Sequence, residues 1–499
     1  MRIKWIMLLA GLLLAACKPE EQKAKEPVKL SVSPEELSFT AEGGEAELIV
    51  TADESPYVTP WDKWIECRKG SYADNKLAVT VKVEKNGEEK ERSSKISIVC
   101  GDEKVYVEVA QEAADNRPVK DDNAAWAVAE KLGIGWNLGN QMDAYANGVA
   151  SETCWGNAKA TQAALNAVAK AGFKTVRIPV TWLGHIGEAP DYKLDETWLE
   201  RVAEIVGYAE NAGLNAIVNI HHDGADSKYW LNIKEAAGNA TRQQEIVAQL
   251  SAIWSQIAVR FKDKGDFLMF ECCNEIHDGS WGWGANRTDG GAQYRCLNEW
   301  NAAFVKAVRA TGGKNADRLL GVPAYCTNID LAIESFVLPE DSAKDKLMLS
   351  VHCYDPGDYC LSAKKSQWGH TADTSKKVAG DNEADLKASF EKLFEHFVSK
   401  GIPVYLGECG CVNRGNAVEQ AFQQYYLSYF ARLASLYGVP ALLWDNGATG
   451  SGNESFGYIN HSSGAYCSKG AEEAVKALVS SYNSGESLDA VYDKAPQNK

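Results

Sequence analysis

Eight short apolar runs, separated by longer amphipathic stretches, are the feature that most restricts how this chain can fold. The runs lie at 133–136, 175–179, 216–220, 267–270, 319–322, 347–351, 404–406 and 441–443. Between them apolar residues recur at helical spacing, as Leu199, Val202 and Val206 do. Eight strand-then-helix repeats over roughly 360 residues predict an α/β fold of the (β/α)8 TIM barrel type. A doubly wound sheet also alternates strands and helices, but no Gly-x-Gly-x-x-Gly sequence follows the first run.

The segment before the barrel, residues 30–113, has a different period. Apolar and polar residues alternate, most clearly from Leu77 to Val83, and turn residues such as Gly43 and Gly44 separate the short runs. This pattern predicts a small immunoglobulin-like β-sandwich. With Trp64 and the closing residues 109–111 it resembles the BACON domain, a module whose name implies carbohydrate binding. The alternative is a spacer that binds nothing and holds the barrel away from the membrane to which the N-terminus of the chain would be attached.

The first residues predict export and lipid attachment. A basic start is followed by an apolar run, residues 5–14, that is too short to remain as a membrane-spanning helix. The sequence Leu14-Ala15-Ala16-Cys17 resembles a bacterial lipobox, in which the cysteine is lipidated and becomes the first mature residue. The acidic residues that follow resemble the surface-export signal of lipoproteins in the Bacteroides group. We therefore expect an outer-membrane lipoprotein exposed at the cell surface; an ordinary signal peptide with a chance cysteine is the alternative.

These patterns divide the chain into six parts. We expect a lipoprotein signal peptide (1–16), a tether (17–29), the sandwich (30–113), a linker (114–122), the barrel (123–485) and a tail (486–499). Of the 13 cysteines, Cys67 and Cys100 fall in the sandwich and could form a disulfide, an option that the sequence leaves open.

The charge balance narrows the range of partners. A formal net charge of −16 and a pI of about 5.1 would repel nucleic acid, so we expect no nucleic-acid partner. A neutral polysaccharide suits such a chain. The 15 Trp and 20 Tyr residues offer flat apolar faces on which pyranose rings can stack. We expect a monomer that is held at the membrane by its lipid.

Polar side chains follow the apolar runs, at the end of a barrel where function gathers. Glu275 follows the fourth run and Glu408 follows the seventh. Two carboxyl groups from different strands that meet over one cleft are what glycoside hydrolysis requires, because one donates a proton while the other attacks the sugar or activates water. Asp223 and Asp445, which follow the third and eighth runs, are the alternative carboxylates.

The residues around the two glutamates occur in an ordered set of motifs. These are Gly-Trp-Asn-Leu-Gly-Asn at 135–140, Val-Arg-Ile-Pro at 176–179, Asn-Ile-His-His at 219–222, Asn-Glu at 274–275, Val-His-Cys-Tyr at 351–354, Gly-Glu at 407–408 and Leu-Trp at 443–444. The set is similar to that of glycoside hydrolase family 5. Residues 152–157, Glu-Thr-Cys-Trp-Gly-Asn, resemble its subfamily 4, which holds endoglucanases and xyloglucanases.

The resemblance implies a role for each matching residue. Glu275 would be the general acid/base and Glu408 the nucleophile of a double displacement with retention, with their carboxyl groups about 5–5.5 Å apart. Arg177 would keep Glu408 ionised, since a fixed cation lowers the pKa of a carboxyl group. The other substrate-binding residues would be Asn140, His221, His222, Asn274 (on the sugar 2-hydroxyl), His352, Tyr354 (against Glu408) and Trp444 (the stacking floor). The first strand carries no histidine, and we expect neither a catalytic metal nor a cofactor.

Three hypotheses for the function remain at this point. The favoured one is an endo-acting β-1,4-glucan hydrolase that cleaves xyloglucan, mixed-linkage β-glucan or cellulose; the others are a β-mannanase and a non-catalytic glycan-binding lipoprotein. Ile276 stands where the family usually has Pro, at a position that does no chemistry. The insertion at 277–291, with Trp281 and Trp283, is either a subsite loop or a packed surface turn.

Overall fold

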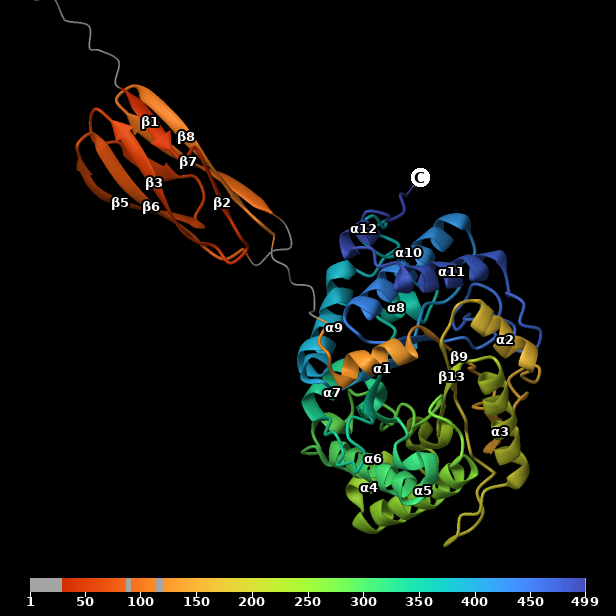
Figure 1. The fold of residues 1–499 in the computed structure, drawn as a ribbon. Coiled ribbons are helices and arrows are strands. Elements are labelled where there is room, and N and C mark those ends of the chain that lie inside the picture. The colour runs from red at the N-terminus through yellow and green to blue at the C-terminus, as the bar shows by residue number, and fades with distance from the viewer. Residues whose placement is uncertain (1–28, 87–90, 114–119, 499) are drawn as a thin grey trace, which may run out of the picture. The chain divides into compact units, whose positions relative to one another are not determined.

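The computed structural model describes residues 29–86, 91–113 and 120–498, and the chain forms two compact units, Met1–Arg117 and Pro118–Lys499 (Figure 1). The predicted signal peptide, Cys17, nearly all of the tether and most of the linker lie outside the described residues. None of the helices in the described part of the chain combines the length and the apolar content that a bilayer crossing requires.

The N-terminal unit is a sandwich of two four-stranded sheets, as its alternating sequence predicts. One sheet has the order β1 (Leu30–Ser33), β3 (Gly44–Ala52), β6 (Lys76–Val83), β5 (Ile65–Ala73), and the other the order β2 (Glu36–Phe39), β8 (Glu103–Gln111), β7 (Arg92–Cys100), β4 (Tyr57–Pro60). Val79 and Val81 on β6 and Val107 on β8 are fully buried in the core between the sheets. Cys67 and Cys100 are free thiols, so the disulfide option is not taken.

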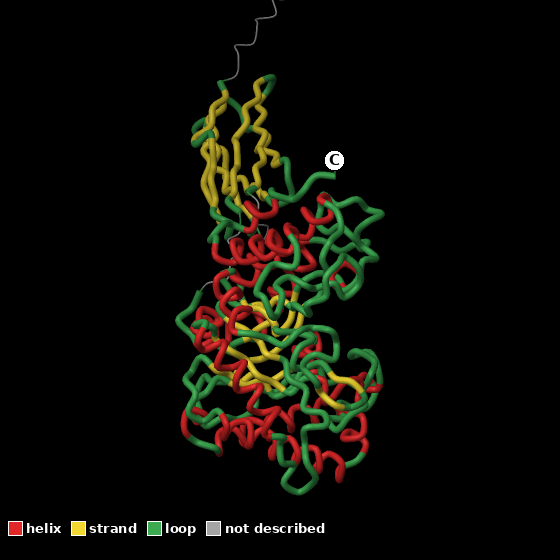
Figure 2. Tube along the Cα trace, turned by 90° about the vertical axis from the view of Figure 1, so that its right-hand side faces the viewer, coloured by secondary structure: helices red, strands yellow, loops and turns green. Residues whose placement is uncertain are grey.

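The C-terminal unit is a closed barrel of eight parallel strands, which confirms the predicted fold class. In barrel order the strands are β9 (Gly135–Asn137), β12 (Thr175–Ile178), β13 (Asn215–Asn219), β14 (Leu268–Glu271), β15 (Leu320–Pro323), β16 (Leu347–Cys353), β17 (Val404–Cys409) and β18 (Ala441–Leu443). Each predicted apolar run forms one of these strands. Figure 2 shows the strands enclosed by helices, which is why the runs are apolar throughout and do not alternate.

The helices that cover the barrel each bury one face. They are α1 (Ala124–Leu132), α2 (Gln162–Lys170), α3 (Glu196–Asn211), α4 (Ile233–Gly238), α5 (Ala240–Arg260), α6 (Ala292–Ala310), α7 (Ile329–Ser335), α8 (Gly357–Cys360), α9 (Glu383–His396), α10 (Ala417–Leu436), α11 (Lys469–Asn483) and α12 (Leu488–Tyr492). On α3, Val202 and Val206 are fully buried, as their spacing predicts. The segment 486–498, which the sequence analysis set apart as a tail, contains α12, which packs against α10 and buries Val491.

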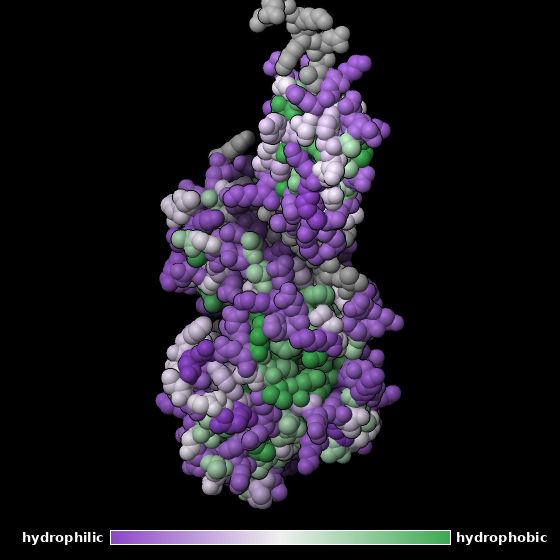
Figure 3. Space-filling view, turned by 90° about the vertical axis from the view of Figure 1, so that its left-hand side faces the viewer, coloured by the Kyte–Doolittle hydropathy of each residue, from purple (hydrophilic) through white to green (hydrophobic). Residues whose placement is uncertain are grey.

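Shorter elements complete the unit. A hairpin pairs β10 (Tyr145–Ala146) with β11 (Val149–Ala150), and single 3-10 turns lie at η1 (His222–Ser227), η2 (Ala285–Arg287), η3 (Gly313–Ala316), η4 (Tyr325–Thr327) and η5 (Val398–Lys400). Most of them follow barrel strands and therefore shape the end at which the strands finish. Figure 3 shows a largely hydrophilic surface with one apolar area over the barrel unit.

Candidate active site

Glu275 and Glu408 face each other where their strands end, with His352 between them. One carboxyl oxygen of each glutamate and one ring nitrogen of the histidine all lie within 4.8 Å of one another. His352 Nδ1 is 2.7 Å from Glu275 Oε1 and 3.7 Å from Glu408 Oε2. This gap suits direct attack by a carboxylate, because enzymes that place a water between their carboxyl groups hold them about 6.5–9.5 Å apart.

Gly407 allows β17 to bring Glu408 to this position. A Cβ atom on Gly407 would lie 2.9 Å from His352 Nε2 and 3.2 Å from Ser350 Oγ on the neighbouring strand β16. Any side chain here would push the histidine away from the two carboxyl groups. The Gly-Glu sequence therefore reflects a close approach between two strands.

Arg177, fully buried on β12, is the cation of the site. Its Nη1 donates to Glu408 Oε1 at 2.9 Å and to Asn137 Oδ1 at 3.0 Å, and its Nη2 donates to Asn274 Oδ1 at 2.7 Å. Tyr354 donates its hydroxyl to the other oxygen of Glu408 at 2.9 Å. Both oxygens of Glu408 thus accept a hydrogen bond, as a carboxylate that acts while ionised requires.

The surroundings shift the pKa values of the two carboxyl groups in opposite directions. Burial raises the pKa of Glu408, an effect that the nearby charge of Glu275 adds to and that His352 and Arg177 oppose. Burial acts in the same way on Glu275, but the hydrogen bond from His352 and the nearby positive charges together outweigh it and lower the pKa of that carboxyl group. The contact of 2.7 Å between His352 Nδ1 and Glu275 Oε1 also holds this carboxyl group in place.

His221 and Trp444 form one wall of the site. Their rings are parallel to within 6°, with centroids 6.0 Å apart. Asn219 donates its amide to His221 Nδ1 at 3.1 Å, so the proton of the neutral ring lies on Nε2, which is 3.9 Å from Glu408 Oε1. Gly139 lies against the indole, since a Cβ atom there would approach Trp444 to 2.7 Å.

Asp143, His221 and His222 are close enough to hold a metal ion, but the hydrogen bonds argue against one. Asn219 is fixed in orientation, because its Oδ1 accepts from Val180 N at 3.0 Å. Asn219 therefore donates its NH2 group to His221 Nδ1, which must accept and so carries no proton. The proton of the neutral ring is then on Nε2, and a protonated nitrogen has no lone pair for a metal.

The alternative carboxylates have structural roles. Asp223 is fully buried and accepts from Trp182 N at 2.9 Å and from Trp230 Nε1 at 2.7 Å. Asp445, also fully buried, accepts from Trp136 Nε1 at 2.9 Å and from three backbone N–H groups. Neither carboxyl group meets another across the cleft as Glu275 and Glu408 do.

Asn140 lies at the edge of the site, beside an aromatic cluster. Its backbone is left-handed, at φ 53°, and its N–H donates to Asp143 Oδ2 at 3.1 Å. His222 Nε2 lies 4.0 Å from the same oxygen, and the ring of His222 clusters with Tyr145 and Trp155, with centroids 5.5–5.6 Å apart. Trp155 is 41% exposed and belongs to the subfamily-like segment 152–157, which is the signal that could have singled it out.

A buried set of residues beneath the pair was not predicted from the sequence. Glu271 lies on β14, and Ser350 and Tyr405 donate to it from β16 and β17. The available signal was a charged residue at an even spacing, four positions before Glu275, in an otherwise apolar strand.

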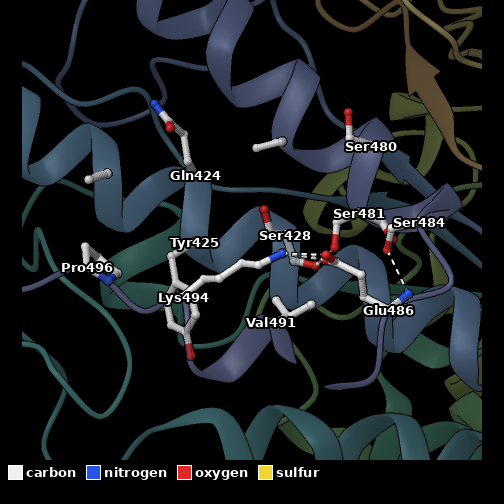
Figure 4. A pocket seen from close by; sticks show the side chains of 12 residues that line it. Gln424, Tyr425, Ser428, Ser480, Ser481, Ser484, Glu486, Val491, Lys494 and Pro496 are labelled. Atoms are coloured by element: carbon white, nitrogen blue, oxygen red, sulfur yellow. Dashed lines mark hydrogen bonds and ion pairs between the residues drawn. The ribbon is translucent and has the colours of Figure 1, made fainter. Parts of the chain in front are cut away.

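A cavity of about 490 Å³ between α10, α11 and α12 is separate from this site (Figure 4). Its lining includes Gln424, Ser481 and Lys494, and the lysine is paired with Glu486 at 2.6 Å. None of its lining residues belongs to the set at the strand ends.

A (β/α)8 barrel that presents two glutamates at this spacing, one bonded to a histidine and the other held by an arginine and a tyrosine, is the scaffold of a retaining glycoside hydrolase. Comparison with known proteins gives the family. Residues 140–450 match the model for cellulase (glycosyl hydrolase family 5), and residues 29–114 match the model for the viral BACON domain. The chain belongs to glycosyl hydrolase family 5.

Similar proteins carry related activities in their names. Endoglucanase A of Paenibacillus barcinonensis is 36% identical over 68% of this chain and 85% of its own length. A broad-specificity GH5-4 endoglucanase from Bacteroides salanitronis is 55% identical, with a TM-score of 0.71 over 74% of this chain and 99% of that chain. A Bacteroides ovatus GH5 xyloglucanase, solved with a XXXG heptasaccharide, is 26% identical, with a TM-score of 0.64 over 92% of this chain and 100% of that one.

Proposed function

We propose that this chain is an endo-β-1,4-glucanase that cleaves unbranched and xylose-branched β-glucans with retention, using Glu275 as the acid/base and Glu408 as the nucleophile. The observation that carries the assignment is the pair of carboxyl groups within 4.8 Å, of which only Glu408 is bonded to a buried arginine. Membership of family 5 supports it.

The first step forms a covalent intermediate. Glu408 attacks the anomeric carbon, the glycosidic C–O bond breaks, and Glu275 gives its proton to the departing oxygen. Tyr354 and Arg177 hold the attacking carboxylate from both of its oxygens, which fixes its direction. In the second step Glu275 takes a proton from water, the resulting hydroxide attacks the same carbon, and Glu408 leaves unchanged.

Asn274 fits the role of binding the 2-hydroxyl of the sugar. Its Oδ1 accepts from Arg177 Nη2, so the amide nitrogen points away from the arginine and can donate. Trp444, with only 8% of its surface exposed, supplies the floor on which the ring lies. A hydrogen bond to the 2-hydroxyl strengthens as positive charge develops on the sugar.

The loop 277–291 supports internal cleavage of a polymer. It starts two residues after the acid/base residue. Trp281 stacks on His277 with centroids 4.2 Å apart, and Trp281 and Trp283 are 56% and 72% exposed. Asp278 holds the loop by accepting from Ser280 N and Ala285 N. Two exposed indoles on a braced loop are suited to further glucose units beyond the cleavage point.

The names of the relatives guide the choice of polymer. The Bacteroides salanitronis enzyme is described as broad in specificity and the Bacteroides ovatus enzyme as a xyloglucanase. These descriptions favour a glucan over mannan as the substrate of this chain, and a site that tolerates xylose branches.

We also propose that Cys17 is lipidated and anchors the enzyme to the outer membrane, facing outward. The support is the lipobox-like sequence at 14–17 and the acidic residues after it. Expression of the full chain and of Cys17→Ser in a Bacteroides host tests this, with the wild type expected in protease-accessible membranes and the variant released.

The enzymatic proposal is tested with protein from residue 18 onward, assayed on xyloglucan, barley β-glucan, carboxymethylcellulose and mannan. Glu408→Gln is expected to lose several orders of magnitude in rate, and Glu408→Gly to regain activity with azide. Preferential release of reducing ends from mannan would replace the glucanase with a mannanase. Binding without release from any polymer would replace the enzyme with a glycan-binding protein.

A further inference from the structure

Glu271 is a fully buried charge at the end of β14, the strand that precedes the acid/base residue, and the reaction scheme leaves it unused. Its Oε2 accepts from Arg177 Nε at 2.7 Å and from Asn219 Nδ2 at 2.9 Å. Its Oε1 accepts from Ser350 Oγ at 2.6 Å and from Tyr405 OH at 2.9 Å. The four donors come from β12, β13, β16 and β17, so Glu271 joins strands from all around the barrel interior.

These contacts keep Glu271 ionised. Burial alone would raise the pKa of its carboxyl group, but the charge of Arg177 and the hydrogen bonds outweigh burial and lower it. Each oxygen accepts two hydrogen bonds, which uses the full capacity of a carboxylate. No acceptor remains free for a substrate.

Arg177 connects Glu271 to the nucleophile through one rigid group. The guanidinium is planar, so a hydrogen bond that fixes Nε also fixes the direction in which Nη1 points. Nε faces Glu271 and Nη1 faces Glu408. The negative charge of Glu271 also reduces the positive potential that Arg177 exerts on Glu408.

We propose that Glu271 is a positioning residue, which holds the guanidinium of Arg177 against Glu408 and offsets part of its charge there. The proposal rests on the assignment of Glu408 as the nucleophile. It makes Glu271 a determinant of how reactive that carboxylate is, without contact between Glu271 and the sugar.

Glu271→Gln tests the electrostatic part, because it removes the charge and keeps the shape. The amide oxygen can face Arg177 and Asn219, while its NH2 group faces Ser350 and Tyr405, whose hydroxyls can rotate to accept. With the charge of Arg177 unopposed, Glu408 holds its proton less tightly and attacks more weakly. We expect the acidic limb of the kcat/KM profile on a soluble β-glucan to move to lower pH by about one unit, kcat to fall about tenfold and KM to stay unchanged.

Glu271→Asp tests the positioning part, because it keeps the charge and shortens the reach to Arg177. We expect kcat to fall at least about tenfold while the acidic limb stays near its wild-type position. This second variant also keeps the proposal open to refutation if Glu271→Gln does not fold.

Asp341→Asn is the matched control. Asp341 forms a buried, two-point ion pair with Arg309, at 2.8 and 2.7 Å, in the helical layer. Its loss should lower the midpoint of thermal unfolding and leave the pH profile in place.

A folded Glu271→Gln with wild-type kcat and an unmoved acidic limb would overturn the proposal, as would Glu271→Asp with wild-type kcat. Failure of the proposed function would look different, since Glu408→Gln would then remain active in the same assay.

Discussion

Nη1 of Arg177 lies 2.9 Å from Oε1 of Glu408, and the two side chains are 0% and 7% exposed. A charged pair that is this deeply buried is costly to break, because the remaining charge has no water to solvate it. The pair therefore fixes the place of the attacking carboxylate and opposes the burial that raises its pKa.

Arg177→Lys should reduce kcat by roughly a hundredfold. The arginine satisfies acceptors on Glu271, Asn137, Asn274 and Glu408, and a single ammonium group cannot reach all four. Because Arg177 works to lower the pKa of Glu408, a weaker contact should move the acidic limb of kcat/KM to higher pH, opposite to the shift expected for Glu271→Gln. A shift of the acidic limb in the same direction for both variants would contradict the opposing effects of Arg177 and Glu271 on Glu408, provided that circular dichroism shows both variants to be folded.

Gly407→Ala should lower kcat by at least about tenfold, because the new Cβ atom would displace His352 from the two glutamates. Gly207 on α3 is the matched control, since a Cβ atom there meets nothing within 4 Å. Gly207→Ala should leave kcat unchanged and raise the free energy of unfolding by up to about 1 kcal/mol, as alanine favours helix. Equal kcat values for the two variants would show that catalysis does not depend on the close approach of Gly407 to His352.

Replacement of Trp281 or Trp283 by alanine should raise KM for a polymer about fivefold, since one stacking contact contributes about 1 kcal/mol. Hydrolysis of a short aryl cellobioside, which does not reach the loop, should be unaffected. Trp61 is an equally exposed tryptophan of the sandwich, at 57%, and Trp61→Ala is the control. If the loop variants cleave polymer as the wild type does, the segment 277–291 is a surface turn.

The stability of the protein should carry a contribution that decreases between about pH 4 and pH 7. Burial raises the pKa of Asp143 and of Asp223 to about 7, whereas in the unfolded chain these groups titrate near about 3.9. The folded state binds more protons in this window, so the free energy of unfolding falls as the pH rises. Half-buried His222, whose pKa is lowered to about 4, acts in the opposite direction.

The quantity to measure is therefore the free energy of unfolding of parent and variant, determined by chemical denaturation from pH 4 to 8. Asp143→Asn and Asp223→Asn should each remove part of the downward slope, whatever their absolute stability. Asp191→Asn, at an exposed position, should run parallel to the parent. Parallel curves for the two buried positions would show that their carboxyl groups do not titrate in this range.

Activity should be unchanged by prolonged dialysis against EDTA. The reason is the proton on His221 Nε2, which occupies the lone pair that a metal between Asp143, His221 and His222 would need. Loss of activity on dialysis and its recovery with a divalent cation would require Asn219 to adopt another orientation. Measurement of reducing ends before and after dialysis decides between these outcomes.

The sequence by itself determined the eight strands, the sandwich and the catalytic candidates, because each rests on a local pattern. Apolar runs mark buried strands, and a polar residue directly after such a run must lie at the mouth of a barrel. Glu275 and Glu408 could be placed in this way, whereas Arg177 lies within the second run. The family motifs made the assignment specific.

Only the tertiary structure decided what each group contacts. The tautomer of His221 depends on Asn219, the structural roles of Asp223 and Asp445 depend on donors such as Trp230 and Trp136, and the place of Glu271 depends on donors from four strands. The hydrogen bonds to Glu271 and the one between Trp136 and Asp445 join residues that are 52 to 309 positions apart, and such contacts leave no periodic trace in the sequence. They exist because closure of the barrel brings the ends of all eight strands to one small volume, where burial makes each unpaired polar group costly.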